Sequence, residues 1–131
     1  MSKAAGKFTI TGGSEQTIRE APGEVRITRV SGTQRFHGAL VGEGSVEWVF
    51  CYRPDRSARF VGLQRFEGSI DGRAGSLVME SSGDHDGRQS KGRWHVVAGS
   101  GTGELTGIAG DGTFEAPGGP EAAYELEYRL A

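Results

Sequence analysis

The sequence Gly83-Asp84-His85-Asp86-Gly87 places one histidine between two aspartates, a combination of side chains that could bind a metal ion. The same run is typical of a tight turn, because Asp and Gly favour turn geometry. His37 and His95 lie on other expected strands, and the chain has none of the ligand spacings of zinc sites. We therefore predict a hairpin tip here, with no metal site and no cofactor.

Cys51 is the single cysteine and could act as a nucleophile. The strand face on which it is expected also carries Glu47 and Val49, with no histidine to activate the thiol. A buried structural thiol is the better interpretation. Serine chemistry would need a G-x-S-x-G elbow on a strand–helix turn, and the sequence has none. These patterns identify no catalytic residue.

The segment 99–112 reads GSGTGELTGIAGDG and could in principle cradle a phosphate. A Walker loop needs a Lys-Ser/Thr pair, and a dinucleotide fingerprint needs G-x-G-x-x-G between a strand and a helix. Neither pattern fits this segment. Glycine serves where the backbone needs positive φ or close approach, so we predict a tightly shaped turn and corner. Leu105 and Ile108 are its large apolar residues.

The composition limits the partners of the chain. A length of 131 residues fits one domain, and a net charge of −2 gives no general attraction to nucleic acid or to an anionic membrane surface. No stretch is apolar enough to span a bilayer, and the start MSKAAGKFTI lacks the apolar core of a secretory signal. One cysteine excludes an internal disulfide. We expect a soluble cytoplasmic protein.

Short alternating runs separated by turn signals indicate an all-β protein. Phe8 and Ile10 alternate with polar residues near the start of the chain, and Tyr124, Leu126 and Tyr128 do so near its end. We predict one domain, residues 1–131, folded as an eight-stranded antiparallel barrel. Besides the two terminal strands, strands are expected near 24–36, 38–53, 58–70, 73–83, 88–98 and 103–116.

Two Asp-Gly pairs predict how three of these strands are aligned, because this dipeptide favours two-residue hairpins. The turn at 71–72 places Gln64 opposite Met79, and the turn at 86–87 places Met79 opposite Trp94. On the other face, Glu80 then lies opposite Arg93 as a solvent-facing ion pair. The apolar residues of segment 24–37 change phase, which predicts a bulge near residues 28–32.

The face that carries the large aromatic residues is expected to point into the barrel. Trp48, Phe50 and Tyr52 share this face if the connection after them is five residues long or bulged. Eight strands leave an interior that either fills with side chains or holds one small ligand. We take the ligand as the working hypothesis and the filled core as the alternative. The expected ligand-binding residues are Trp48, Phe50, Tyr52, Phe60, Gln64, Phe66, Met79, Ser81 and Trp94.

The glycine run resembles a signature of the allene oxide cyclase-like barrels and the dirigent proteins: a Gly-Ser/Thr-Gly step, a hydrophobic residue and Gly-x-x-Gly. Residues 42–114 resemble an uncharacterised bacterial family with such a barrel. The pieces that carry this resemblance are GEGSVEWVFCYRPD, RFVGLQRFEGSIDGRAGSLVME and GRWHVVAGSGTGELTGIAGDGTF.

This resemblance implies an eight-stranded barrel that assembles as dimers or higher oligomers. Better-studied barrels of the superfamily fold a reactive apolar substrate inside the barrel and steer its cyclisation or coupling without a metal or organic cofactor. In the close family, the position of Gln64 is often glutamate and that of Ser81 is often histidine. Such an acid and base could transfer protons, whereas Gln64 and Ser81 only hydrogen-bond.

Two functional hypotheses follow. In the first, the barrel binds an apolar small molecule, and any reaction is a cofactor-free isomerisation or cyclisation controlled by the shape of the lumen. In the second, the barrel is filled, and the protein is a non-catalytic binding module or an assembly of several copies. Its contacts would then be made by the outer residues Arg65, Glu80, Arg93 and His95.

Overall fold

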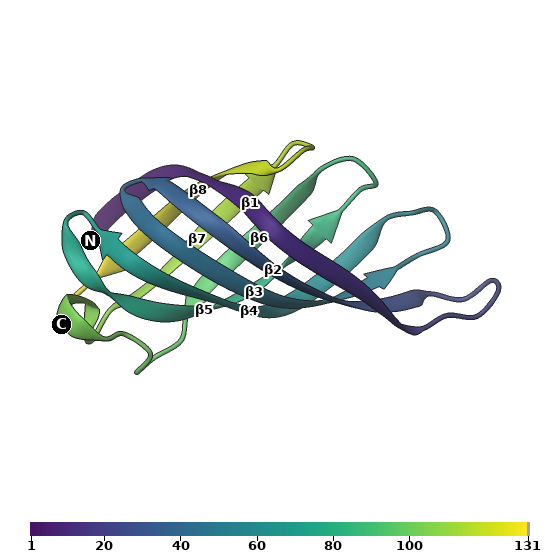
Figure 1. The fold of residues 1–131 in the computed structure, drawn as a ribbon, viewed down its shortest axis with the longest axis horizontal. Coiled ribbons are helices and arrows are strands. Elements are labelled where there is room, and N and C mark those ends of the chain that lie inside the picture. Colours follow the sequence, from purple (N-terminus) through teal and green to yellow (C-terminus); the bar gives the residue numbers. More distant parts are fainter. Residues whose placement is uncertain (131) are drawn as a thin grey trace.

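Eight antiparallel strands run up and down and close into a barrel in the computed structural model, which describes residues 1–130 (Figure 1). The predicted fold class is therefore confirmed, and Ala131 of the predicted domain lies outside the described residues. Each strand pairs with its neighbours in sequence, and β1 pairs with β8 to close the ring. The strands are β1 (Ser2–Arg19), β2 (Arg26–Gly38), β3 (Leu40–Tyr52), β4 (Ala58–Ile70), β5 (Arg73–His85), β6 (Ser90–Val96), β7 (Ala109–Ala116) and β8 (Glu121–Arg129).

The barrel has two different ends (Figure 1). At one end lie both termini and the connections β2–β3, β4–β5 and β6–β7, and we call this the closed end. At the other, which we call the open end, lie the connections β1–β2, β3–β4, β5–β6 and β7–β8. No helix in residues 1–130 is long and apolar enough to cross a membrane.

The β4–β5 hairpin has the predicted alignment, whereas the β5–β6 hairpin is shifted. Asp71 and Gly72, with φ of 49° and 84°, form the expected two-residue turn, and Gln64 lies opposite Met79. The second connection is a four-residue loop, residues 86–89, in which Asp86 Oδ1 accepts bonds from two backbone N–H groups. Because four residues replace two, Trp94 lies opposite Ser81 and the inner face is unchanged.

The β3–β4 connection spans residues 53–57, since Tyr52 lies opposite Ala58. This is the five-residue length on which the inward orientation of Trp48, Phe50 and Tyr52 depends. Trp48 is 9 % exposed and Phe50 is partly buried against the core. The predicted parity of the β3 aromatic residues is therefore confirmed.

The predicted bulge in segment 28–32 is wrong. β2 pairs with β3 without interruption, and the two register shifts are in β1, between Ile10 and Gly12 and between Thr17 and Arg19. The change of phase in β2 has another cause, because Val25 and Ile27 point outward while Thr28 and Val30 point inward. Beyond the first shift, Gly13 and Glu15 are the β1 residues that face the lumen, opposite Gly32 and Val30.

The glycine run closes one end of the barrel. The last predicted strand, 103–116, is instead the short 3₁₀ helix Gly103–Leu105 followed by β7. Residues before this helix run along β5, with Thr102 Oγ1 3.0 Å from the Ser76 nitrogen. Leu105 and Ile108 are 0 % and 2 % exposed and belong to the core, so they plug this end.

Aromatic rings fill the middle of the lumen. The ring centroids of Phe36 and Phe66 are 5.2 Å apart, those of Phe8 and Phe36 5.3 Å, and those of Trp94 and Phe114 5.5 Å. All five side chains are at most 3 % exposed. These rings leave the middle of the barrel packed, so any recess for a ligand has to lie toward an end.

Candidate functional site

An unfilled recess remains at the open end, and we call it the open-end pocket. It has a volume of about 340 Å³. Ile10, Val30, Val46 and Trp48 supply its apolar side chains, and Glu15 is its only acidic residue. β1 stops pairing with β8 after Thr9, so the longer β1–β2 hairpin forms one wall of the recess by itself. Glycines and serines complete the lining at Gly12, Gly13, Ser14, Ser31 and Gly32.

The side chain of Trp48 lines this pocket, and its indole N–H is buried without a hydrogen-bond partner among the described residues. Gly62, the cross-strand neighbour of Trp48, leaves room for the ring. A Cβ atom at Gly62 would lie 2.7 Å from Trp48 Cδ1. The indole therefore leans over Gly62 toward Ser81, the next residue in the same row, whose hydroxyl is also unpartnered within residues 1–130.

A third buried donor ends a chain of hydrogen bonds. Trp94 Nε1 donates to Gln64 Oε1 at 2.9 Å, and Gln64 Nε2 donates to Gln34 Oε1 at 2.6 Å. The side-chain nitrogen of Gln34 has no partner in the described part of the chain, and this residue is 1 % exposed. Leaving a buried polar group unpaired costs about 1–3 kcal/mol, so three such groups in one lumen need a physical explanation.

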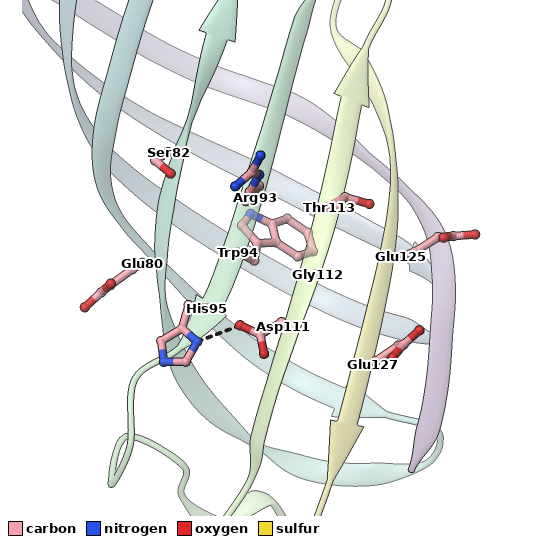
Figure 2. A pocket seen from close by; sticks show the side chains of 10 residues that line it. All are labelled: Glu80, Ser82, Arg93, Trp94, His95, Asp111, Gly112, Thr113, Glu125 and Glu127. Carbon is pink, nitrogen blue, oxygen red and sulfur yellow. Dashed lines mark hydrogen bonds and ion pairs between the residues drawn. The ribbon is translucent and has the colours of Figure 1, made fainter.

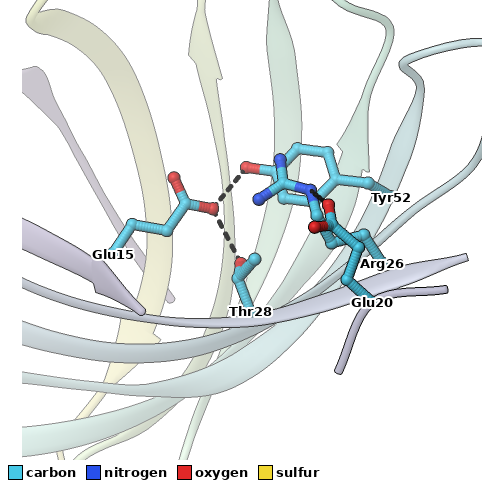
Figure 3. Close-up of polar contacts among 5 residues, drawn as sticks. All are labelled: Glu15, Glu20, Arg26, Thr28 and Tyr52. Carbon is cyan, nitrogen blue, oxygen red and sulfur yellow. Dashed lines mark hydrogen bonds and ion pairs between the residues drawn. The ribbon is translucent and has the colours of Figure 1, made fainter. Parts of the chain in front are cut away.

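Glu15 stands at the rim of the open-end pocket and is held by two hydroxyl groups (Figure 3). Thr28 Oγ1 and Tyr52 Oη donate to its Oε2 at 2.7 and 2.8 Å. Within residues 1–130, no hydrogen bond or ion pair reaches its other oxygen, Oε1. The carboxylate is therefore fixed in place with one oxygen free to accept a proton.

Tyr52 keeps its proton over a wide pH range. Burial raises its pKa to about 12, and the hydrogen bond to Glu15 and the charge of that carboxylate contribute in the same direction. Arg26 stacks on the Tyr52 ring, with its guanidinium carbon 4.5 Å from the ring centroid. Its Nε lies 3.7 Å from Glu20, so Arg26 is paired with that residue instead of neutralising Glu15 (Figure 3).

A second depression, of about 500 Å³, lies on the outer face of β5–β8 (Figure 2). Its side chains point away from the barrel, apart from Trp94, which lies on the inner side of the wall. His95 Nδ1 lies 2.6 Å from Asp111, and this hydrogen bond raises the pKa of His95. Both side chains are more than half exposed, and the surrounding charges are solvated, so this depression is the weaker candidate.

The outer face differs from the prediction in one ion pair, while contacts of Arg65, Glu80, Arg93 and His95 with a partner stay a prediction. Glu80 lies opposite His95 and Arg93 opposite Ser82, so the expected Glu80–Arg93 pair is wrong, for the reason that the β5–β6 loop is two residues longer. Arg65 pairs with Glu67 on its own strand. Cys51 is partly exposed on the outer face and is not the buried thiol expected. Side chains alternate along β3, and because Phe50 and Tyr52 point into the barrel, Cys51 between them points outward. Among residues 1–130, no three His, Cys, Asp or Glu side chains cluster in a way that could hold a metal ion.

The predicted ligand-binding residues fall into two groups. Trp48 lines the open-end pocket, and Phe50 and Tyr52 follow it along β3 toward the open end. The others are buried deeper, at most 2 % exposed, and none lines the pocket. These deeper residues are Phe60, Gln64, Phe66, Met79, Ser81 and Trp94.

Sequence reasoning missed Glu15. Continuing the alternation of Phe8 and Ile10 would place Ser14 inside and Glu15 outside, and the β1 register shift reverses this. The adjacent glycines Gly12 and Gly13 were the available signal, because paired glycines in a strand often mark a bulge.

Comparisons with known proteins agree on one family. A family model described as "Protein of unknown function (DUF3224)" matches residues 4–128. The chain is similar to a crystal structure of a DUF3224 protein of unknown function from Shewanella oneidensis MR-1, with 26 % identity and a TM-score of 0.80. The alignment covers 100 % of this chain and 98 % of that one. No curated protein matches.

Proposed function

We propose that this chain, which belongs to the DUF3224 family, binds an apolar small molecule in the open-end pocket. The observation that carries this proposal is an apolar recess lined by Ile10, Val30, Val46 and the Trp48 ring, in a barrel whose middle is packed with rings. A bound apolar molecule would bury its surface against these side chains.

The size and chemistry of the pocket support a ligand of one or two fused rings. Small-molecule sites are mostly apolar, have volumes of about 300–1,000 Å³ and contain a few polar groups that fix orientation. The open-end pocket is near the lower limit of that range. The resemblance to allene oxide cyclase-like barrels also supports the proposal, since those barrels enclose apolar substrates.

Filling the pocket tests this function directly. Val30→Trp places a large ring in the recess, and Val49→Trp places the same ring on the outer face, where Val49 is 42 % exposed. Using 1-indanone as the probe and calorimetry as the readout, we expect Val30→Trp to weaken binding at least about tenfold, because the ring occupies the space of the probe. Val49→Trp is expected to bind like the wild type. Equal binding by all three folded proteins would rule out the open-end pocket.

A second candidate function, proton transfer without a cofactor, is favoured by the position of Glu15. Glu15 is an exposed residue that lines the pocket on the same cross-strand row as Trp48, and its Oε1 has no hydrogen-bond partner among residues 1–130. A carboxylate beside an apolar site can act as a general base. Thr28 and Tyr52 would position it through their hydrogen bonds to Oε2.

For a ketone, the step would proceed as follows. Glu15 takes a proton from the carbon next to the carbonyl, and the electron pair of that C–H bond forms the C=C bond of an enolate while the carbonyl electrons move onto oxygen. The protonated carboxyl then returns the proton to carbon. If the carboxyl first swaps its proton with solvent, return to the same carbon replaces that hydrogen by one from solvent. In an unsaturated ketone, whose enolate extends over a further C=C bond, return of the proton to the far carbon isomerises the double bond.

Deuterium exchange tests this candidate. The wild type in D₂O is expected to exchange the protons next to the carbonyl of 1-indanone faster than buffer does, as followed by NMR. Glu15→Gln removes the base, so the exchange is expected to fall to the buffer rate. Glu24→Gln is the matched control, since Glu24 pairs with Arg19 in the hairpin and does not line the pocket. Exchange at the wild-type rate in Glu15→Gln would exclude this function.

A further inference from the structure

Trp94, Gln64 and Gln34 are linked by two hydrogen bonds, and we call this series the relay. Its first member, Trp94, fixes the direction in which the hydrogen bonds are donated. The indole nitrogen of Trp94 can only donate, so Gln64 must present its carbonyl oxygen to it. The amide nitrogen of Gln64 is then aimed at Gln34, which must present its own oxygen. A flipped amide at either glutamine would place donor against donor.

The chain therefore ends on a donor. Gln34 Nε2 carries two N–H bonds and finds no acceptor among the residues that the structure describes. The amide is held at its other end by a 2.6 Å bond, so it cannot turn to hide this nitrogen without breaking the relay. Whatever satisfies Gln34 must bring an acceptor atom into the barrel.

Gln34 lies directly below the open-end pocket. It is opposite Ile10, two residues from Gly32 on the same face of β2, and both of these residues line the pocket. Gly32 has no side chain to separate Gln34 from the recess. A molecule in the pocket that points an oxygen atom inward would approach Gln34 along this side.

We propose that Trp94, through Gln64 and Gln34, makes the open-end pocket selective for ligands that bring an acceptor oxygen, such as a carbonyl, over ligands that bring an N–H or O–H donor. This inference rests on the proposed binding function and adds the polarity of the ligand to it. Trp94 acts as a positioning residue through Gln64, and Gln34, which lies next to the lining residues Ile10 and Gly32, is the group expected to donate to an inward-pointing ligand oxygen.

Three probes of nearly equal shape test the polarity. Indene has no polar atom, 1-indanone adds an acceptor oxygen, and indole adds a donor N–H. One good hydrogen bond changes affinity roughly tenfold, so the wild type is expected to bind 1-indanone about tenfold more tightly than indene, and indole no more tightly than indene. Titration calorimetry gives the three dissociation constants. Equal affinity for indene and 1-indanone would overturn the inference.

Substitutions along the relay separate it from a general effect of structure. Gln34→Leu is expected to remove the preference for 1-indanone over indene. Gln16→Leu, the same change at an exposed site on β1, is expected to keep it. Trp94→Phe removes the donor that fixes the direction, so Gln64 and Gln34 can both turn and present an oxygen. The preference for 1-indanone over indole is then expected to shrink or reverse, an outcome that a loss of packing alone would not produce.

The outcomes distinguish the two proposals. If the wild type binds none of the three probes, the proposed function fails. If it binds all three equally, the pocket is a binding site and the relay does not select the ligand. If Trp94→Phe and Gln34→Leu both fold and both retain the wild-type preference, another donor is responsible and the inference is wrong.

Discussion

The two ends of the barrel are built from the same strands but differ in whether their buried polar groups have hydrogen-bond partners. At the closed end, Tyr124 Oη donates to the His37 carbonyl at 2.8 Å and accepts from the Leu40 N–H at 2.9 Å, while Leu105 seals the core. At the open end, Trp48 Nε1 is buried with no partner in the described residues, and Ile10 is 37 % exposed. The closed end is packed as a protein core, whereas the open end keeps an apolar recess and a buried donor without a partner among residues 1–130.

The comparison predicts that loss of stability concentrates at the closed end. Leu105→Ala leaves a cavity at a fully buried position and is expected to lower the free energy of unfolding by about 2–5 kcal/mol. Ile18→Ala, at a 59 % exposed position of the open-end hairpin, is expected to change it by less than about 0.5 kcal/mol. Urea unfolding followed by Trp fluorescence measures both. A similar loss in the two variants would contradict the division between the ends.

The two tryptophans sharpen the same comparison. Trp94→Phe leaves Gln64 Oε1 without its donor, whereas Trp48→Phe removes a donor that is already unpaired. Both variants lose the same ring volume, so the difference between them isolates the hydrogen bond. We expect Trp94→Phe to be less stable than Trp48→Phe by about 1–3 kcal/mol. The prediction is wrong if Trp48→Phe is the less stable protein.

Two tyrosine–carboxylate hydrogen bonds, one at each end, are expected to give a smaller difference in the free energy of unfolding. Tyr128 donates to Asp71 at the closed end and is 2 % exposed, whereas Tyr52 donates to the exposed Glu15 at the rim of the open-end pocket. Tyr128→Phe is expected to cost about 1–2 kcal/mol in the free energy of unfolding, and Tyr52→Phe less than about 1 kcal/mol, because water replaces the lost partner more easily at the rim. Thermal unfolding of both variants checks this order.

The ionisation of Tyr52 is expected to have the smallest effect on stability. Its pKa is about 12 in the folded protein, compared with roughly 10 in an unfolded chain, so the folded state holds this proton more tightly. The resulting stabilisation is fully present below pH 10 and is lost as the pH rises through 12. NMR of ¹³C-labelled tyrosine is expected to give a lower pKa for Tyr52 in Glu15→Gln. An unchanged pKa would mean that the Glu15–Tyr52 bond does not form in solution.

The barrel could be predicted from the sequence because its signals are local. Asp71-Gly72 set one hairpin, and the alternation of Tyr124, Leu126 and Tyr128 marked an inner face. The Asp86-Gly87 hairpin was shifted because Asp86 Oδ1 accepts from the backbone N–H groups of Arg88 and Gln89 in a four-residue loop, and no sequence pattern distinguishes this loop from a two-residue turn.

The candidate site was predicted only in part because it depends on a bulge and on packing across the barrel. Trp48 was expected in the lumen from the parity of β3. Glu15 was not expected there, since one unpaired residue in β1 decides its face. Which aromatic residues fill the centre and which border a recess depends on ring contacts between distant strands, such as Trp48 with Phe114 at 6.4 Å.

The central claim, that the open end binds a ligand, is tested most directly by the two tryptophan indole N–H signals in an NMR titration. The chain has two tryptophans, Trp48 and Trp94, so each signal can be assigned with one substitution. On addition of 1-indanone, we predict a shift of the Trp48 N–H signal, because the Trp48 ring lines the pocket, with a smaller change at Trp94, whose N–H is already bonded to Gln64. If neither signal moves at saturating probe, or if the largest shifts lie on the outer face of β5–β8, the open end is not the binding site.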